Sequence, residues 1–289
     1  MWWVGVDHRA VWVKLISLRI SSILLIILAS LVTCALRALR LRLLFPSLTP
    51  VDALRVTTTH TALTRILPAR SGELSLPATL SRLGFSLGDG ALAMVWLRLL
   101  EVACLFSTLL LASFVLAEPL LFHWTWIGLG LLVSTIAIFI TRPLLAKMIY
   151  SVQKHLPDKW SHAPSSTSSL ERAKVTRITL CTLLILLSQA MLFWSILNAV
   201  GAELGYLKAL IGSGGVHLAG IIPAPTIGNV GSHELGWALS YSQLGVSAAA
   251  VTSSAILSQW LTLILALLWW LLASLIPSRH PSEAGASSS

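Results

Sequence analysis

The sequence predicts an all-α polytopic membrane protein with about five full spans and two inverted re-entrant helical hairpins. The 289 residues are 56% hydrophobic and only 11% charged, against about 25% charged in soluble domains. The mean hydropathy is +0.83. The apolar residues form long unbroken runs, unlike the short alternating strands of a membrane barrel. This composition excludes a soluble enzyme, a nucleic-acid-binding module and a disordered protein, because each needs more charge on its surface.

Each predicted span is an apolar run close to the length of about 20 residues that crosses a bilayer as a helix. The runs cover residues 20–36 (extendable toward Phe45), 91–116, 121–141, 178–200 and 248–276. We expect them to form one integral membrane domain over residues 1–277, followed by a short polar disordered tail at 278–289.

Basic residues predict the orientation of the chain in the membrane. The chain has 20 Lys and Arg residues against 11 Asp and Glu residues, and such basic residues gather in cytoplasmic loops. The loop over residues 142–177 is rich in Lys and Arg, whereas the turn at 117–120 has none. We therefore expect the long loop to be cytoplasmic in a multi-pass membrane protein. The basic end of the first span, Arg37, Arg40 and Arg42, is interpreted as a cytoplasmic stop.

Two interrupted segments, at 52–90 and 207–245, predict an internal repeat. Both contain prolines and glycines, which break helices and allow tight reversals, and each lies between two apolar runs. Two short matches relate them: Leu67–Pro68–Ala69 with Ile222–Pro223–Ala224, and Leu83–Gly84–Phe85–Ser86 with Leu244–Gly245–Val246–Ser247. The loop charges place the entrances of the two segments on opposite sides of the membrane. We therefore expect repeat 1 at about 20–116 and an inverted repeat 2 at about 178–276, separated by the extra span 121–141 and the cytoplasmic loop 142–177. Such repeats place a substrate site near the membrane midplane.

Arg98 and Glu101 are charged residues inside a predicted span. Each charge at a helix centre costs about 2.5–3.5 kcal/mol on insertion scales. Their spacing of i and i+3 places them on one helix face, where they can pair. Two interpretations stay open: a buried pair that holds helices together, or the charged lining of a path for lipid headgroups.

Further charged residues lie beside the interrupted segments. Arg65, Arg70 and Glu73 are close to the expected turn of the first hairpin, where they contact either solvent or an anionic headgroup. Glu234 follows the glycines of the second hairpin in a stretch otherwise free of Asp, Glu, Lys and Arg. It is either a solvated interfacial carboxylate or the partner of Arg98 or Arg70 across the repeat axis.

No residue pattern indicates a soluble-type active site or a cofactor. The chain has no phosphate-cradling Gly–Lys–Ser/Thr loop and no nucleophile elbow. Its three cysteines lie inside apolar stretches, and no Cys/His spacing resembles a metal site. We expect no metal and no cofactor.

The chain resembles the lysylphosphatidylglycerol synthase transmembrane-region family, also called flippase-like domain proteins. The resemblance covers roughly residues 20–276 and rests on two signatures. The first is met by Pro68, Arg70, Gly72, Glu73, Leu80, Arg82, Gly84, Arg98 and Glu101. The second is met by Pro223, Pro225, Gly228, Val230, Gly231 and Glu234, with Asn229 in place of a glycine. The resemblance implies lipid handling, and it excludes lysine transfer because this chain lacks the soluble aminoacyl-transferase half.

Together, these observations and the resemblance imply a lipid translocator of the bacterial inner membrane, or a lipid-binding transport protein there, for an anionic or glycosylated lipid. The expected headgroup-binding residues are Arg65, Arg70, Glu73, Arg98, Glu101, Asn229 and Glu234. One alternative is a polyprenyl-phosphate-dependent glycosyltransferase, for which Glu73 is the best acidic group. Another is a non-catalytic subunit of an envelope lipid or polysaccharide assembly complex. The expected partners are a membrane lipid and either a second copy of the chain or an envelope-biosynthesis enzyme, but not nucleic acid.

Overall fold

The computed structural model describes residues 19–116, 130, 172–220 and 231–277, and all elements within these ranges are helices. In chain order they are α2 (Ile20–Leu44), α3 (Pro50–Ile66), the 3₁₀ helix η2 (Pro68–Leu74), α4 (Ser75–Arg82), α5 (Leu87–Leu116), α7 (Arg172–Ala199), α8 (Tyr206–Ala219), α9 (Ser232–Gln243) and α10 (Ala248–Leu275). Four of them, α2, α5, α7 and α10, are long and apolar enough to cross a membrane. This confirms the prediction of an all-helical membrane protein. The fifth predicted span, 121–141, lies outside the described residues apart from Gly130.

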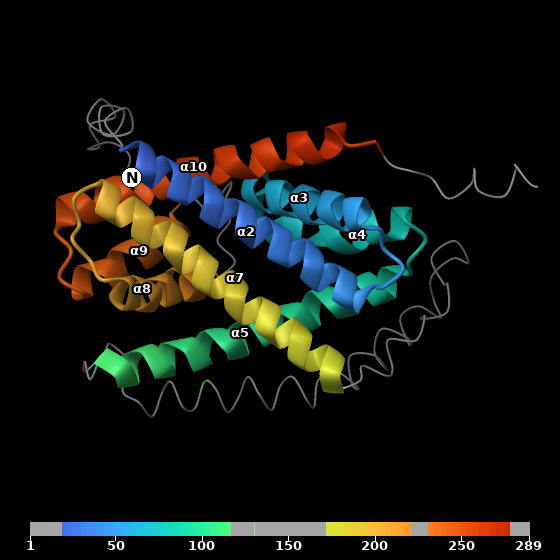
Figure 1. The fold of residues 1–289 in the computed structure, drawn as a ribbon, viewed down its shortest axis with the longest axis horizontal. Coiled ribbons are helices and arrows are strands. Elements are labelled where there is room, and N and C mark those ends of the chain that lie inside the picture. Colours follow the sequence, from blue (N-terminus) through green and yellow to red (C-terminus); the bar gives the residue numbers. More distant parts are fainter. Residues whose placement is uncertain (1–18, 117–129, 131–171, 221–230, 278–289) are drawn as a thin grey trace, which may run out of the picture.

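The helices fall into two halves with the same order. Along the chain, the first half (α2 to α5) begins and ends with a long helix and has the shorter α3 and α4 between them. The second half (α7 to α10) likewise begins and ends with a long helix and has α8 and α9 between them. The first helices of the halves are antiparallel. Thr33 of α2 contacts Ser188 of α7, and Arg40, farther along α2, contacts Thr182, which comes earlier in α7. In Figure 1 α5 and α10 also run in opposite directions along the two long edges of the molecule.

The two halves also pack against each other in a reciprocal way. Helix α2 lies along α7 at the centre of the molecule, while α10 packs against α3 and α5 packs against α8. The last long helix of each half therefore covers the first short helix of the other half. Arg55 of α3 fixes one of these contacts, because its guanidinium donates to the carbonyl oxygens of Ala273 and Ile276 at the end of α10.

The Leu–Gly–x–Ser match found in the sequence forms the same turn in both halves. Gly84 and Gly245 have φ values of +87° and +84°, which favour glycine. In each turn the residue after the glycine donates its backbone N–H to the fifth residue before it, Phe85 to Leu80 and Val246 to Tyr241. This bond is typical of a Schellman helix end. The serine that follows, Ser86 or Ser247, then accepts a backbone N–H bond at the start of α5 or α10.

The first interrupted segment folds back on itself. Helix α3 begins with an N-cap, because the Thr49 hydroxyl accepts the backbone N–H of Asp52 and Pro50 occupies the first turn. It ends at Ile66 because Pro68 disfavours helical geometry in the residue before it. Gly72 then allows η2 to lie against α3, since a Cβ at that position would overlap the backbone of Leu63. The corresponding break in the second half, with Pro223 and Pro225, lies outside the described residues.

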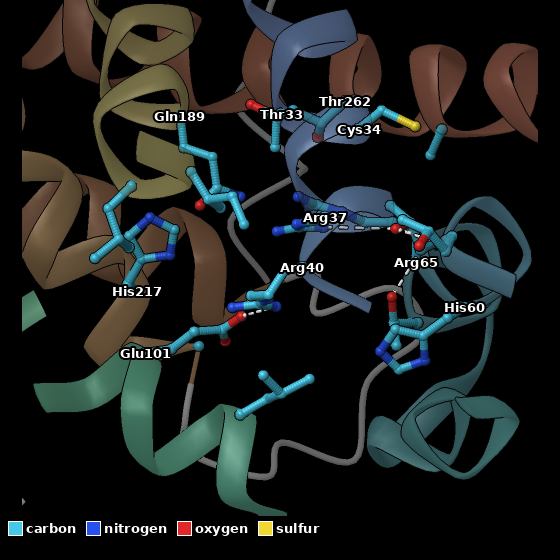
Figure 2. A pocket seen from close by; sticks show the side chains of 18 of the residues that line it. Thr33, Cys34, Arg37, Arg40, His60, Arg65, Glu101, Gln189, His217 and Thr262 are labelled. Atoms are coloured by element: carbon cyan, nitrogen blue, oxygen red, sulfur yellow. Dashed lines mark hydrogen bonds and ion pairs between the residues drawn. The ribbon is translucent and has the colours of Figure 1, made fainter. Parts of the chain in front are cut away.

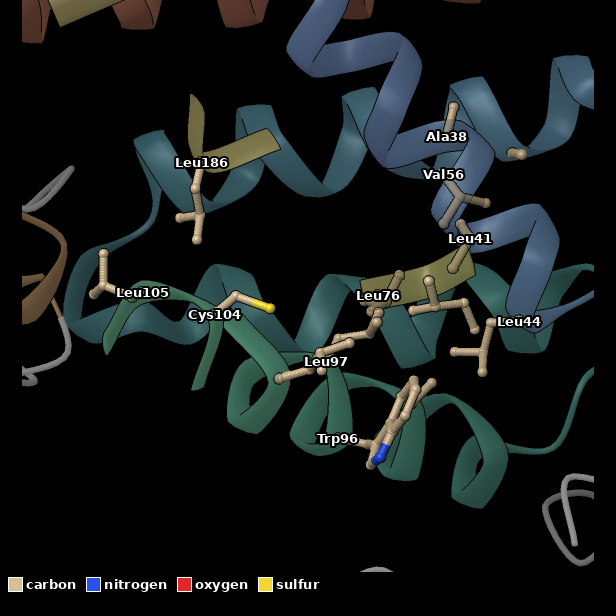
Figure 3. Packing of buried hydrophobic residues seen from close by; sticks show 14 of the residues in the cluster. Ala38, Leu41, Leu44, Val56, Leu76, Trp96, Leu97, Cys104, Leu105 and Leu186 are labelled. Carbon is tan, nitrogen blue, oxygen red and sulfur yellow. The ribbon is translucent and has the colours of Figure 1, made fainter. Parts of the chain in front are cut away.

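Two clusters of buried apolar side chains hold the helices together. One lies among the first-half helices, α7 and α8, and includes Leu76, Trp96 and Leu97 (Figure 3). The other joins α7 to α8, α9 and α10 around Phe193 and Trp237. Large apolar side chains also stay exposed on the long helices; examples are Leu24, Leu111, Phe114, Ile264 and Leu275. Exposed apolar faces of this extent are typical of helices that contact lipid.

Candidate functional site

A cavity of about 300 Å³ with charged, polar and apolar lining residues lies where the two halves meet. Every described helix contributes to its wall. The first half provides residues from α2, α3, η2, α4 and α5, among them Arg37, Arg40, Thr57, His60, Thr61, Thr64, Arg65, Glu73, Leu76, Arg98 and Glu101. The second half provides residues from α7, α8, α9 and α10, among them Gln189, Phe193, His217, His233, Thr262 and Trp269. The volume is at the small end of the range for ligand pockets.

A chain of ion pairs runs along the first-half side of the cavity. Glu101 is its centre: Oε1 accepts from Arg40 Nη2 at 2.7 Å, and Oε2 accepts from Arg98 Nη1 at 2.8 Å. Arg98 Nη2 continues the chain to Glu73 Oε1 at 3.1 Å. The Arg40 side chain is only 8% exposed, whereas that of Arg98 is 46% exposed. The chain therefore links α2, α5 and η2, with a buried arginine at one end and an accessible arginine next to the other.

Two further arginines of the first half face the cavity outside this ion-pair chain. Arg37 reaches in from α2, where its Nη1 lies 3.5 Å from the Thr61 hydroxyl and its buried Nε has no hydrogen-bond partner in the described structure. Arg65 reaches in from the end of α3 (Figure 2). Burial and the neighbouring Arg37 guanidinium lower the pKa of Arg65 to about 10, so Arg65 stays positively charged at neutral pH. Neither arginine forms an ion pair with a carboxylate among the described residues.

The histidines add polarity to the cavity without adding charge. His60 of α3 shares a hydrogen bond of 3.0 Å with the Ser75 hydroxyl, and burial together with the Arg98 charge lowers its pKa to about 3. Burial lowers the pKa of His217 in α8 to about 4. Both rings are therefore neutral at physiological pH, and the positive charge of the site comes from arginine.

The second half lines the opposite side of the cavity with uncharged groups. In Figure 2 Gln189 of α7 and His217 lie across the cavity from Arg65 and His60, with Arg37 and Arg40 between them. The buried Nε2 of His217 has no hydrogen-bond partner in the described part of the chain. His233 of α9 instead bonds to the Ser258 hydroxyl at 2.8 Å. The wall formed by α7 to α10 thus offers neutral hydrogen-bonding groups.

The structure brings together four of the seven binding residues expected from the sequence: Arg65, Glu73, Arg98 and Glu101 all line the cavity. The predicted Arg98–Glu101 pair is present. The side chain of Arg70 and the whole of Asn229 lie outside the described residues.

Glu234 differs from its predicted arrangement. It is absent from the cavity wall, and its carboxylate accepts the backbone N–H of Gly231 at 2.6 Å at the start of α9. Its expected partnership with Arg98 is therefore wrong, since Arg98 pairs with Glu73 and Glu101. The physical reason is local: a glutamate three residues after a helix N-cap reaches back to the unpaired backbone N–H there.

Sequence reasoning missed Arg37 and Arg40 as cavity residues, because it interpreted them as part of a basic stop at the membrane surface. Only Arg42 fits that interpretation, since it is exposed and absent from the cavity wall. A signal was present in the sequence. Thr33, Arg37 and Arg40 recur at intervals of three or four residues, which places them on one face of a helix.

In the described ranges no group of three or more His, Cys, Asp or Glu side chains could hold a metal ion. The cysteines Cys34, Cys104 and Cys181 are free thiols. The arrangement is suited to binding an anion: buried guanidiniums on one side, neutral donors on the other, and a volume that suits a small group.

Comparison with known proteins adds one match. The family model described as Lysylphosphatidylglycerol synthase TM region matches residues 1–269. These residues include the first helical half, the second half as far as Trp269 in α10, and every described cavity residue. No curated protein matches the chain.

Proposed function

Because the chain belongs to the lysylphosphatidylglycerol synthase TM region family, we propose that it is an inner-membrane lipid translocator or lipid-binding transport protein. Its central cavity would bind the headgroup of an anionic or glycosylated membrane lipid. The observation that carries this proposal is the excess of arginine over carboxylate among the described wall residues of the cavity of a helical membrane protein. Arg37, Arg40, Arg65 and Arg98 line it, against Glu73 and Glu101.

The positive charges of the cavity arginines need compensating negative charge or hydrogen-bond acceptors. A cation inside a helical membrane protein is costly and pairs with a carboxylate, with backbone carbonyls or with a ligand. Arg40 and Arg98 have carboxylate partners. The remaining positive charge favours a negatively charged ligand such as the phosphate of a lipid, to which guanidinium groups bind in a bidentate manner.

The size of the cavity fits a headgroup better than a whole lipid. About 300 Å³ accommodates a small polar group, whereas acyl chains would stay against the exposed apolar faces of the long helices. The lipid would thus keep its tails in the bilayer while its headgroup moves through the protein.

We propose that the two halves are inverted repeats and that the α3–α4 and α8–α9 segments are re-entrant hairpins. The antiparallel directions of α2 and α7, the reciprocal packing and the shared Leu–Gly–x–Ser turns support this arrangement. The hairpins would enter from opposite sides, the first from the cytoplasm, with loop 142–177 also cytoplasmic. A site between inverted repeats can open alternately to each side.

Glu101 would couple the ligand to the protein. Its two oxygens hold one buried and one accessible arginine. A headgroup that attracts Arg98 would compete with Glu101 and Glu73 for that guanidinium. Exchange of these partners offers a way to bind a headgroup on one side and release it on the other.

The sugar-transferase alternative gains no support from the geometry. It would need Glu73 as an acid or base in contact with water and substrate, but Glu73 Oε1 accepts a hydrogen bond from Arg98. We therefore retain the transport proposal.

A liposome assay tests the proposal. Purified protein would be reconstituted with a fluorescent anionic phospholipid, and its movement between leaflets would be followed with a quencher that does not cross the membrane. We expect Arg98→Ala and Glu101→Gln to slow movement by roughly tenfold or more, because a charge-assisted hydrogen bond contributes about 1.5–3 kcal/mol. Arg42→Gln is the matched control, since Arg42 is exposed and lies outside the cavity. Movement no faster than in protein-free liposomes, or unchanged in both folded cavity variants, would overturn the proposal.

A further inference from the structure

The cavity separates its arginines into two classes. Arg40 and Arg98 are compensated, because the chain Arg40–Glu101–Arg98–Glu73 joins two guanidiniums to two carboxylates at 2.7–3.1 Å. Arg37 and Arg65 form no ion pair among the described residues. Among the described residues of the cavity wall, two positive charges therefore have no carboxylate partner.

These two charges act on each other, because the Arg37 guanidinium helps to lower the pKa of Arg65. Arg37 comes from the middle of α2 and Arg65 from the last turn of α3, and both side chains point into the same part of the cavity in Figure 2. The hydrogen bond of Arg37 to Thr61 is long, at 3.5 Å, and its buried Nε lacks a partner within the described structure. Two guanidiniums so placed repel each other unless an anion lies between them.

We propose that the anion is a phosphate group with two negative charges, a phosphomonoester, held between Arg37 and Arg65. This inference rests on the proposed function and specifies its ligand. A phosphomonoester carries a charge of about −1.5 to −2 near neutral pH and offers three acceptor oxygens. A phosphodiester carries a single charge and would leave one of the two guanidiniums uncompensated.

The opposite wall completes the site. Gln189 and His217 face Arg37 across the cavity, and the His217 Nε2 is buried without a partner in the described ranges. A phosphate bound by two guanidiniums would present its remaining oxygen to these neutral donors. The first half would thus supply charge and the second half additional hydrogen bonds.

Native mass spectrometry of the purified full chain in detergent tests this inference. The protein would be mixed at about pH 8, above the second pKa of about 6 of a phosphomonoester, with equal amounts of short-chain phosphatidic acid and phosphatidylglycerol. These lipids share their tails and differ in having a monoester or a diester headgroup. We expect one phosphatidic acid per chain, bound roughly tenfold more tightly than phosphatidylglycerol.

The arginine variants identify the site. Arg37→Gln and Arg65→Gln should each weaken phosphatidic acid binding by roughly tenfold and remove the preference for the monoester. Arg42→Gln removes the same charge from an exposed position of α2 and should leave binding unchanged. Arg37→Lys keeps the positive charge and should retain the preference for the monoester lipid. This variant tests the site if Arg37→Gln does not fold.

Equal binding of the two lipids by the unaltered protein would overturn the inference, as would unchanged binding in folded Arg37→Gln and Arg65→Gln proteins. Inorganic phosphate distinguishes the source of the phosphate. If it displaces phosphatidic acid only in large excess, the ligand is a lipid. If inorganic phosphate competes with phosphatidic acid at equal concentration, the site binds a phosphate dianion but its ligand is not a lipid, and the proposed lipid function fails. If both lipids bind equally and are still transported, the proposed function stands and the dianion inference fails.

Discussion

The two halves of the molecule share a backbone plan but not a chemistry. Both place two short helices between two long ones, and both end the second short helix with the same glycine turn. The charged side chains of the described cavity wall, however, all come from the first half: Arg37, Arg40, Arg65, Glu73, Arg98 and Glu101. The second half contributes Gln189, His217, His233, Thr262 and aromatic side chains.

This difference separates the features that the two halves share from those that only one half has. The turns and the interlocking of α3 with α10 and of α8 with α5 fix the shape of the cavity, so both halves need them. Under the proposed function, charged side chains are needed in only one half, because a single group of guanidiniums can bind a headgroup that lies between the two halves. A second arginine cluster would add the cost of further buried charge without a second ligand.

The largest expected effect concerns the orientation of the halves. Ser81 and Ser242 occupy matched positions, because the backbone carbonyl of each accepts the turn glycine's N–H. In a protein whose three native cysteines are changed to alanine, Ser81→Cys and Ser242→Cys should react with an impermeant thiol reagent from opposite sides of the membrane. We expect Ser81→Cys to react from the cytoplasmic side. Labelling of both from one side would contradict the inverted arrangement.

The next largest effect concerns the charged half. Glu101→Gln leaves Arg40 buried without its carboxylate, and breaking a buried ion pair in this way costs about 3–5 kcal/mol. We expect a marked loss of stability in thermal unfolding of the detergent-solubilised protein. Glu203→Gln is the control, because Glu203 is exposed between α7 and α8 and such changes usually stay within about 0.5 kcal/mol. Equal stabilities would show that the ion-pair chain does not hold the first half together.

A smaller effect tests the shared turns. Gly84→Ala and Gly245→Ala each place a Cβ at positive φ, in open space, which costs about 1–2 kcal/mol. We expect similar losses of stability in the two halves. Gly205→Ala serves as the control, since Gly205 also lies in open space but has φ −67°. A loss at only one of the two turns would show that the halves do not depend on this turn equally.

The smallest effect concerns the neutral wall. Gln189→Ala removes an uncharged group, and a neutral hydrogen bond contributes about 0.5–1.5 kcal/mol. We expect anionic lipid binding to weaken by roughly fivefold, less than in Arg65→Gln, when dissociation constants are measured with the same lipid. A larger effect for Gln189→Ala than for Arg65→Gln would reverse the assignment of roles to the two halves.

The sequence was most informative where the determinants are local. Four apolar runs predicted α2, α5, α7 and α10. The Leu–Gly–x–Ser match was used only to relate two segments, and both copies form the same turn, whose hydrogen bonds span only a few residues. The Arg98–Glu101 pair followed from its i, i+3 spacing in the same way.

The sequence was least informative where contacts join distant helices. Nothing local indicates that Arg40 of α2 pairs with Glu101 of α5, because that contact depends on how the helices cross. The charge pattern instead indicated a surface stop for Arg37 and Arg40. Glu234 shows the opposite case: the sequence left open a solvated carboxylate or a distant arginine partner, and the carboxylate forms a local cap bond to Gly231.

An electron cryo-microscopy map of the protein in nanodiscs that contain an anionic phosphomonoester lipid would test the central claim most directly. The account predicts headgroup density between Arg37 and Arg65 inside the cavity, with acyl chains against the long helices, and loss of that density in Arg65→Gln. A cavity without lipid density, with all lipid confined to the outer faces of the long helices, would contradict it.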